Sequence, residues 1–129
     1  MSNQLAPFPS VSKALRALLK TRFASVGGSL PGELTDLYVR IEMLPGRSSI
    51  HEVDFVFDVE TFAPSYSAAE SAAFAIEALL LGYAGMVEVP GATPVRFDSV
   101  ASSSTPSETF WDDDTVTRFL ATYVITVRR

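Results

Sequence analysis

The stretch from Thr115 to Arg129, TVTRFLATYVITVRR, carries the longest alternation of apolar and polar residues in the sequence. Successive side chains of a strand point to opposite faces of a sheet, so this alternation predicts a strand with one apolar face. The apolar set is Phe119, Ala121, Tyr123, Ile125 and Val127, and the polar set is Arg118, Thr122, Thr126 and Arg128. Because Val116, Leu120 and Val124 interrupt the polar set, we expect this strand in the interior of the sheet or against a neighbouring subunit.

Three further segments alternate in the same way. Residues 37–43 and 53–59 are separated by Pro45, Gly46 and a polar connection, which predicts an antiparallel hairpin. A third strand is expected over 95–101, followed by a small polar loop at Ser102 to Ser107. Residues 86–89 are expected to form a brief extended piece in a turn-rich connection.

Two segments have helical periodicity. The first follows Ser10, a capping residue, and should end at Gly27 and Gly28. Its apolar stripe is Val11, Leu15, Leu18 and Leu19, with Lys13, Arg16 and Lys20 behind it. The second should begin at a capping box formed by Ser67 and Glu70. Its apolar stripe is Ala69, Ala72, Ala73, Ile76, Leu79 and Leu80.

The second helix has another apolar strip on its opposite side, made of Phe74, Ala78 and Leu81. A helix that is apolar on two sides is expected to be buried on two sides. One sheet and two helices offer little protein to cover both, so we predict that this strip is a subunit interface. Packing beneath a long loop is the alternative.

These elements predict an α+β fold with one mixed or antiparallel four-stranded sheet, two helices packed on it, and the order α-β-β-α-β-β. The 129 residues, 47% of them apolar, suit a single domain spanning 1–129, with an extended lead-in over residues 1–9.

Composition excludes several classes of protein. No cysteine is present, so disulfides and thiolate metal sites are excluded. The net charge of -5 disfavours nonspecific phosphate binding as the main activity. The first nine residues do not resemble a signal peptide, and no apolar stretch approaches the ~20 residues that span a bilayer. We expect a soluble chain with no membrane partner.

The most enzyme-like group is His51 with four acids, Glu52, Asp54, Asp58 and Glu60. Carboxylates with a histidine could bind a divalent ion, which would suit a small metal-dependent hydrolase. However, Asp54 and Asp58 should be about 13 Å apart along a strand, and His51 points to the other face. The favoured interpretation is a solvated acidic face, paired with Arg40, Arg96 and Arg118 of neighbouring strands.

An aromatic pair and an acidic triplet precede the last strand: Phe110, Trp111, Asp112, Asp113 and Asp114. We predict that this loop contacts a partner. The triplet lacks the spacing of a calcium loop, so a metal is disfavoured. Trp111 could stack on a ligand, but a half-buried aromatic closing the sheet end is favoured. The sequence also lacks a nucleophile elbow and a phosphate loop, so we expect no catalytic residues and no cofactor.

Over nearly its whole length, the chain resembles the small tail terminator, or tail completion, proteins of long-tailed bacteriophages in the order of its elements and in the residue composition of each. The resemblance rests on the amphipathic first helix, the 37–43 and 53–62 hairpin, the alanine-rich helix over 67–81, and the final strand RFLATYVITVRR after an acidic loop. The resemblance includes no short sequence motif, so no individual functional residue follows from it.

This resemblance implies a non-enzymatic structural protein of the virion, assembled in the host cytoplasm and placed in the tail or neck region. It implies a ring, typically a hexamer, that caps the tail-tube protein and joins it to a head-tail connector or stopper protein. DNA would pass through the lumen without specific binding. Either the acids of the second strand, Glu52, Asp54, Asp58 and Glu60, or the triplet Asp112 to Asp114 would face this lumen. The alternatives are another neck protein, such as a head-closure or adaptor subunit, and the metal-dependent hydrolase.

Overall fold

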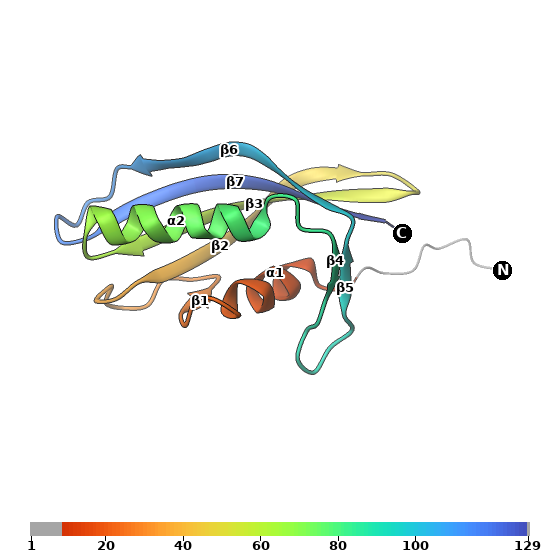
Figure 1. The fold of residues 1–129 in the computed structure, drawn as a ribbon, viewed down its shortest axis with the longest axis horizontal. Coiled ribbons are helices and arrows are strands. Elements are labelled where there is room, and N and C mark those ends of the chain that lie inside the picture. The colour runs from red at the N-terminus through yellow and green to blue at the C-terminus, as the bar shows by residue number, and fades with distance from the viewer. Residues whose placement is uncertain (1–8, 129) are drawn as a thin grey trace.

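The computed structural model describes residues 9–128, so most of the expected lead-in over 1–9 lies outside the described part of the chain. The elements are α1 (Val11–Lys20), β1 (Val26–Gly27), β2 (Tyr38–Ser48), β3 (Glu52–Ala63), α2 (Tyr66–Leu80), β4 (Gly85–Val87), β5 (Val95–Phe97), β6 (Ser99–Thr109) and β7 (Thr117–Arg128). Figure 1 shows their arrangement.

One sheet organises the molecule, in the order β1-β2-β3-β7-β6, and β4 and β5 form a separate two-stranded sheet. The α+β class is confirmed, but the main sheet has five strands where four were expected. The additional strand is β1, in which Val26 pairs with Val39 in parallel. All other pairs in the main sheet are antiparallel, and β7 lies between β3 and β6 as its two-faced apolar pattern predicted.

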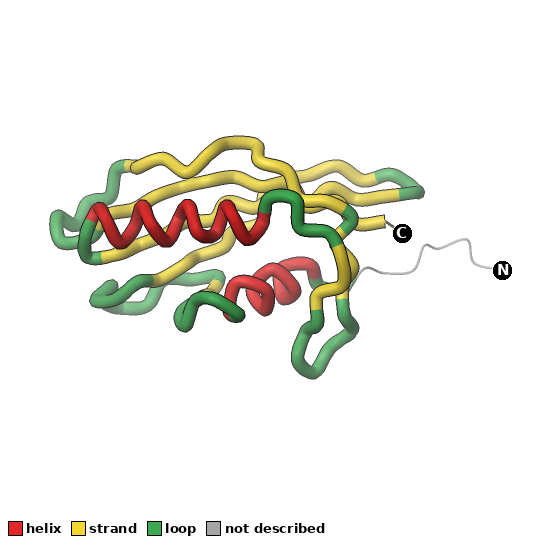
Figure 2. The backbone as a smooth tube through the Cα atoms, viewed as in Figure 1, coloured by secondary structure: helices red, strands yellow, loops and turns green. Residues whose placement is uncertain are grey.

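Both helices cover one face of this sheet, as the layered view in Figure 2 shows. The core joins Leu15 and Leu19 of α1 and Ile76 of α2 to sheet residues such as Phe57 and Ile125, all of which are 0 to 1% exposed. The Tyr123 hydroxyl of β7 donates a hydrogen bond to Glu77 of α2 at 3.4 Å. Burial, together with the nearby Glu77 carboxylate, raises the pKa of Tyr123.

The helix boundaries differ from the sequence expectation at two points. The first helix ends at Lys20 because the Thr21 hydroxyl and amide donate to the Leu18 carbonyl. The second begins two residues early, since Ser65 accepts from the Ala68 amide and is the true N-cap. The predicted capping box at Ser67 and Glu70 is therefore wrong.

The predicted loop over Ser102 to Ser107 is also wrong, because these residues lie within β6. The register of β6 against β7 shifts twice, between Ser102 and Ser104 and between Ser104 and Ser107, and Pro106 lies within the second shift. The break that does occur is at Asp98, between β5 and β6.

On the opposite side of the sheet, β2 continues through Pro45 and Gly46, where the sequence predicted its end. Its register against β3 shifts between Leu44 and Arg47. A Cβ at Gly46 would collide with the Asp54 carbonyl oxygen, so glycine permits this close approach of the two backbones. Among residues 9–128, no helix has the length and apolar character needed to cross a bilayer.

Candidate functional site

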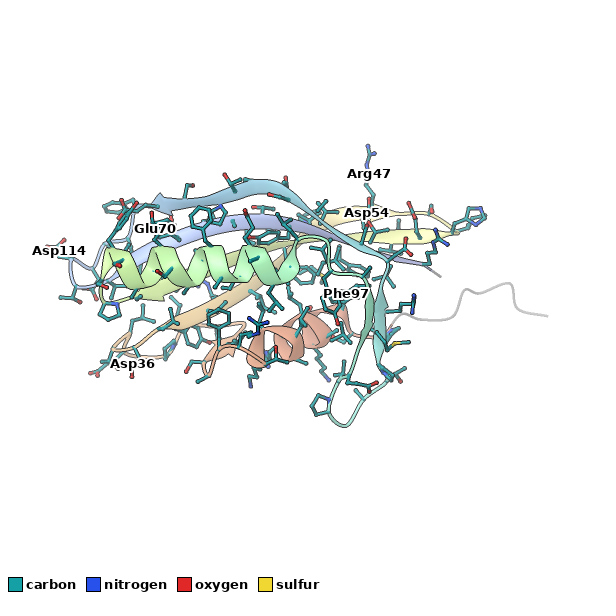
Figure 3. The ribbon with its side chains drawn as sticks, viewed as in Figure 1. Asp36, Arg47, Asp54, Glu70, Phe97 and Asp114 are labelled. Carbon is teal, nitrogen blue, oxygen red and sulfur yellow. The ribbon has the colours of Figure 1, made fainter. Side chains whose placement is uncertain are left out.

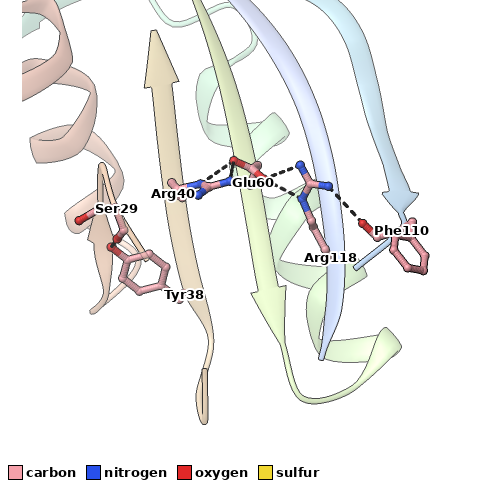
Figure 4. Close-up of polar contacts among 6 residues, drawn as sticks. All are labelled: Ser29, Tyr38, Arg40, Glu60, Phe110 and Arg118. Atoms are coloured by element: carbon pink, nitrogen blue, oxygen red, sulfur yellow. Dashed lines mark hydrogen bonds and ion pairs between the residues drawn. The ribbon is translucent and has the colours of Figure 1, made fainter. Parts of the chain in front are cut away.

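The face of the sheet that the helices leave open is built around Glu60 of β3. One carboxylate oxygen accepts from Arg40 of β2, with nitrogen–oxygen distances of 2.6 Å, and the other accepts from Arg118 of β7 at 2.6 and 2.7 Å. Arg118 also donates to the Phe110 carbonyl at 3.2 Å. Figure 4 shows this chain of contacts running across three strands to the end of β6. One carboxylate thus ties both neighbouring strands and the 110–114 loop to β3.

Aromatic rings cover the same end of the open face. Trp111 packs edge-on against Phe62, with ring centroids 4.9 Å apart. The Arg118 guanidinium lies over Trp111, and the Arg40 guanidinium lies over Phe62. Glu60 is consequently only 2% exposed. The favoured interpretation of Trp111, a half-buried aromatic at the sheet end, is confirmed.

The four predicted acids therefore lie in different environments. Glu52 is exposed at the start of β3, whereas Asp54 and Asp58 are half-buried and accept from the Thr126 and Thr122 hydroxyls at 2.7 and 2.6 Å. Glu60 does not belong to a solvated or lumen-lining face, because two guanidiniums enclose it. Arg96 is not a partner of these acids either, since it lies on β5 opposite Met86.

The 110–114 loop is partly folded onto itself and partly exposed. The Asp113 carboxylate accepts from the Thr115 hydroxyl at 2.6 Å and from the Thr115 amide at 2.9 Å. These bonds hold the pKa of Asp113 below its usual range. Phe110 is 85% exposed, and Asp112 and Asp114 are exposed. A hollow of about 430 Å³ lies between this loop and the beginning of β7.

The apolar strip on α2 faces away from the sheet. Phe74 is 46% and Leu81 is 40% exposed, and Ala78 between them is also exposed. The opposite stripe of α2, which contains Ala69, Ala73 and Ile76, is buried. The described chain therefore covers one apolar side of this helix and leaves the other exposed.

No arrangement suited to acid–base chemistry emerges on the open face. His51 is exposed in the turn between β2 and β3, while Asp54 and Asp58 each hold a threonine hydroxyl. In the described part of the chain, no three histidine or carboxylate side chains converge in a way that could hold a metal ion. These polar contacts serve instead to fix the strands to one another.

Sequence reasoning missed the two threonines that bind the acids, although both stood in the predicted polar set of β7. The missing information was the strand register, which places Asp58 opposite Thr122 and Asp54 opposite Thr126. Cross-strand partners follow from alternation only when the pairing of the strands is known.

No protein-family model matches the sequence, and no curated protein matches it either. Solved structures do match. One is a chain of the structure titled "Virion of native gene transfer agent (GTA) particle", with a TM-score of 0.57 and 17% sequence identity. The match covers 89% of this chain and 84% of that chain, so the two share a fold along most of their length.

Proposed function

We propose that this chain is a structural protein of a phage-like virion. Within the particle it acts as a tail terminator, a ring-forming subunit that caps the tail tube and joins it to the head-tail connector or stopper protein. It carries out no catalysis. It assembles in the host cytoplasm and becomes part of the tail or neck region.

The observation that carries this proposal is the fold likeness to a chain of a gene transfer agent virion over 89% of this sequence. The sequence resemblance to phage tail terminators, which rests on element order and on the residue composition of the elements, points to the same class of particle. The likeness supports a virion protein, and the resemblance supports the more specific role at the end of the tail.

The surfaces of the chain suit a subunit of an assembly. Contiguous exposed apolar residues often mark a contact with another protein. Here Phe74 and Leu81 on α2 and Phe110 in the 110–114 loop are 40 to 85% exposed. We propose that the α2 strip with Ala78 is a contact between subunits and that the loop contacts a partner.

The proposed ring, a hexamer, surrounds a lumen through which DNA passes without specific binding. A net charge of -5 fits this role because like charge keeps a phosphate backbone from adhering to the wall. Among the acids of β3, Glu52, Asp54 and Asp58 keep some exposure and remain candidates for the lumen surface.

Removal of this chain from cells that produce the particle tests the proposal. A tube without its cap continues to add subunits, so electron microscopy should show tails of irregular and excess length, detached from filled heads. Re-expression of the wild-type chain should restore the normal length. Particles that remain intact, with normal tails, would contradict a role in the virion neck.

The same micrographs separate the tail terminator from another neck protein. A head-closure or adaptor subunit acts on the head side, so its loss should leave tails of normal length that fail to attach. That result would retain the virion role and replace the terminator with this alternative.

A further inference from the structure

A groove lies on the helix side of the molecule, between α1 and the turn that joins β4 to β5. Its volume is about 500 Å³. The α1 side contributes Lys13, Arg16, Ala17, Lys20 and Thr21, and the turn contributes Glu88, Val89, Pro90, Gly91 and Ala92. Three cations thus line one side, while apolar residues, among them Val89 at 8% exposure, line much of the rest.

These cations gather because α1 is amphipathic. Positions 13, 16 and 20 are three and four residues apart, so they share the face opposite the buried stripe of Leu15 and Leu19. Both lysines of the sequence are among them. Within residues 9–128, none of the three forms an ion pair, unlike Arg40 and Arg118. Within the described residues, this groove therefore carries three unpaired cations against one carboxylate, Glu88, in a chain that is acidic as a whole.

The 110–114 loop has the complementary chemistry. It presents the most exposed large apolar side chain of residues 9–128, Phe110, followed by Trp111 and three carboxylates. Arg118 fixes its backbone at the Phe110 carbonyl, and Thr115 fixes Asp113, so much of the loop is already ordered before it meets a partner. An aromatic anchor beside acids matches an apolar groove beside cations.

The loop cannot fill the groove of its own chain. Figure 3 shows Asp114 at one end of the long axis, while the connection between β4 and β5 lies toward the other end. A loop and a groove so placed suit two copies that meet head to tail. Repetition of such a contact closes into a ring when the rotation between copies permits it, and otherwise extends as a chain.

We infer that the 110–114 loop of one copy binds the groove between α1 and residues 88–92 of a second copy. This inference rests on the proposed function for its setting, a ring of identical subunits, and it names the partner of the loop as this same chain. Exposed ion pairs alone contribute little, so Phe110 seated on the apolar part of the groove is the anchor.

A charge-swap experiment on the purified full chain tests the contact. One variant carries Asp112→Lys and Asp114→Lys, and leaves Asp113 in place because it orders the loop. A second carries Lys13→Glu and Lys20→Glu. Sedimentation velocity at low ionic strength should show self-association of the wild type, and each variant alone should lose at least about tenfold in association constant. An equimolar mixture of the two variants should recover most of it, because the reversed loop meets the reversed groove.

Matched variants separate this contact from general effects. Glu42→Lys with Glu52→Lys changes the net charge as the loop variant does, but on exposed residues outside the loop, and should leave association within about twofold of the wild type. Phe110→Ser should weaken association at least about tenfold, whereas Ile50→Ser, at a residue 67% exposed in the turn between β2 and β3, should not. Circular dichroism should show that every variant is folded.

A wild type that stays monomeric at all concentrations overturns the inference, as do loop and groove variants that associate like the wild type. Loss of duplex DNA binding in the groove variant, with self-association unchanged, would overturn it in favour of a phosphate ligand. If the swap fails while removal of the chain still gives overlong tails, the proposed function stands without this contact. If the swap succeeds and tails are unaffected, the contact stands and the function fails.

Discussion

The two faces of β3 are held by different physical forces. On the helix side, Phe57 and Val59 are 0 and 2% exposed within a continuous apolar core. On the open side, Asp58 and Glu60 are held by a threonine hydroxyl and two guanidiniums from neighbouring strands. One face is buried by packing against helices, and the other is satisfied by polar partners within its own sheet.

This difference determines which face of the sheet must stay buried and which can contact water or another protein. An apolar face must stay covered at all times, because its stabilisation comes from the removal of area from water. A face whose charges are already paired can contact water or another protein surface without an unpaired charge being left behind. The open face can therefore become an assembly surface while the helix side preserves the fold.

The largest effect should come from the helix side. Phe57→Ala removes a ring that is 0% exposed and leaves a cavity, so the free energy of unfolding should fall by about 3 to 5 kcal/mol in urea titration. Met43→Ala is the matched control, because Met43 pairs with Phe57 on the neighbouring strand but is 55% exposed. Because directly opposite residues share a face of the sheet, equal losses for the two variants would show that burial against the helices does not set the loss.

A smaller loss is expected at the centre of the open face. Glu60→Gln leaves Arg40 and Arg118 without their carboxylate, and should lower the free energy of unfolding by about 2 to 3 kcal/mol. The loss is limited because the two arginine side chains keep about a fifth of their area exposed, at 23% and 21%. Glu52→Gln, at the exposed start of the same strand, should cost less than about 0.5 kcal/mol. A Glu60 variant as stable as this control would show that the network contributes no stability.

Single polar pairs should matter less again. Thr122→Val keeps the side-chain shape but removes the hydroxyl that donates to Asp58, so urea titration should show a loss of about 0.5 to 1.5 kcal/mol. Thr105→Val, at an exposed position of β6, is the control and should be close to neutral. A double variant with Asp58→Asn should lose less than the sum of the two single losses, since the two residues share one bond. Additive losses would argue against that bond.

The smallest effect lies in the 110–114 loop. Because Thr115 donates to the Asp113 carboxylate only in the folded chain, the pKa of Asp113 lies below its unfolded value. The ordering that these bonds provide is complete above the unfolded pKa and is lost as the pH falls through the lower, folded value. Carboxyl chemical shifts followed by NMR should show the lowered pKa. Thr115→Val should raise it toward the usual range, and an unchanged value would show that the hydroxyl is not its cause.

The faces of the sheet and two of the predicted arginine partners of the acids, Arg40 and Arg118, could be read from the sequence, whereas the register that brings both to one buried carboxylate could not. Alternation placed Phe119 and Tyr123 on the buried side of β7, and the apolar interruptions at Leu120 and Val124 placed that strand in the sheet interior. The burial of Glu60 had no local signal, because its two arginines lie 20 and 58 residues away in the chain. Alternation showed which residues share a face, but not the pairing that brings them together.

The prediction of a loop over Ser102 to Ser107 was wrong for a related reason. Serine has little intrinsic preference for strands, so the local composition indicated a loop. The backbone of β7, supplied by a segment that follows later in the sequence, forms the strand by pairing with it. The candidate surfaces were easier to predict, since exposed aromatic and charged residues such as Phe110 and Asp114 stand out in the sequence itself.

The irregular edges of the main sheet affect whether further chains can add to it. An unpaired strand can act as a template on which further chains add their backbones without limit, as in fibrils. Here β1 pairs with only Val39 and Arg40 of β2, so the rest of β2 is an edge, as is β6. Both strands carry a proline and a break in register, at Pro45 and at Pro106, which makes each a poor template. In the proposed ring, copies of this chain would therefore recognise one another through side chains, whose geometry can specify a finite number of subunits. A molecule proposed to terminate a polymer is thus itself protected from becoming one.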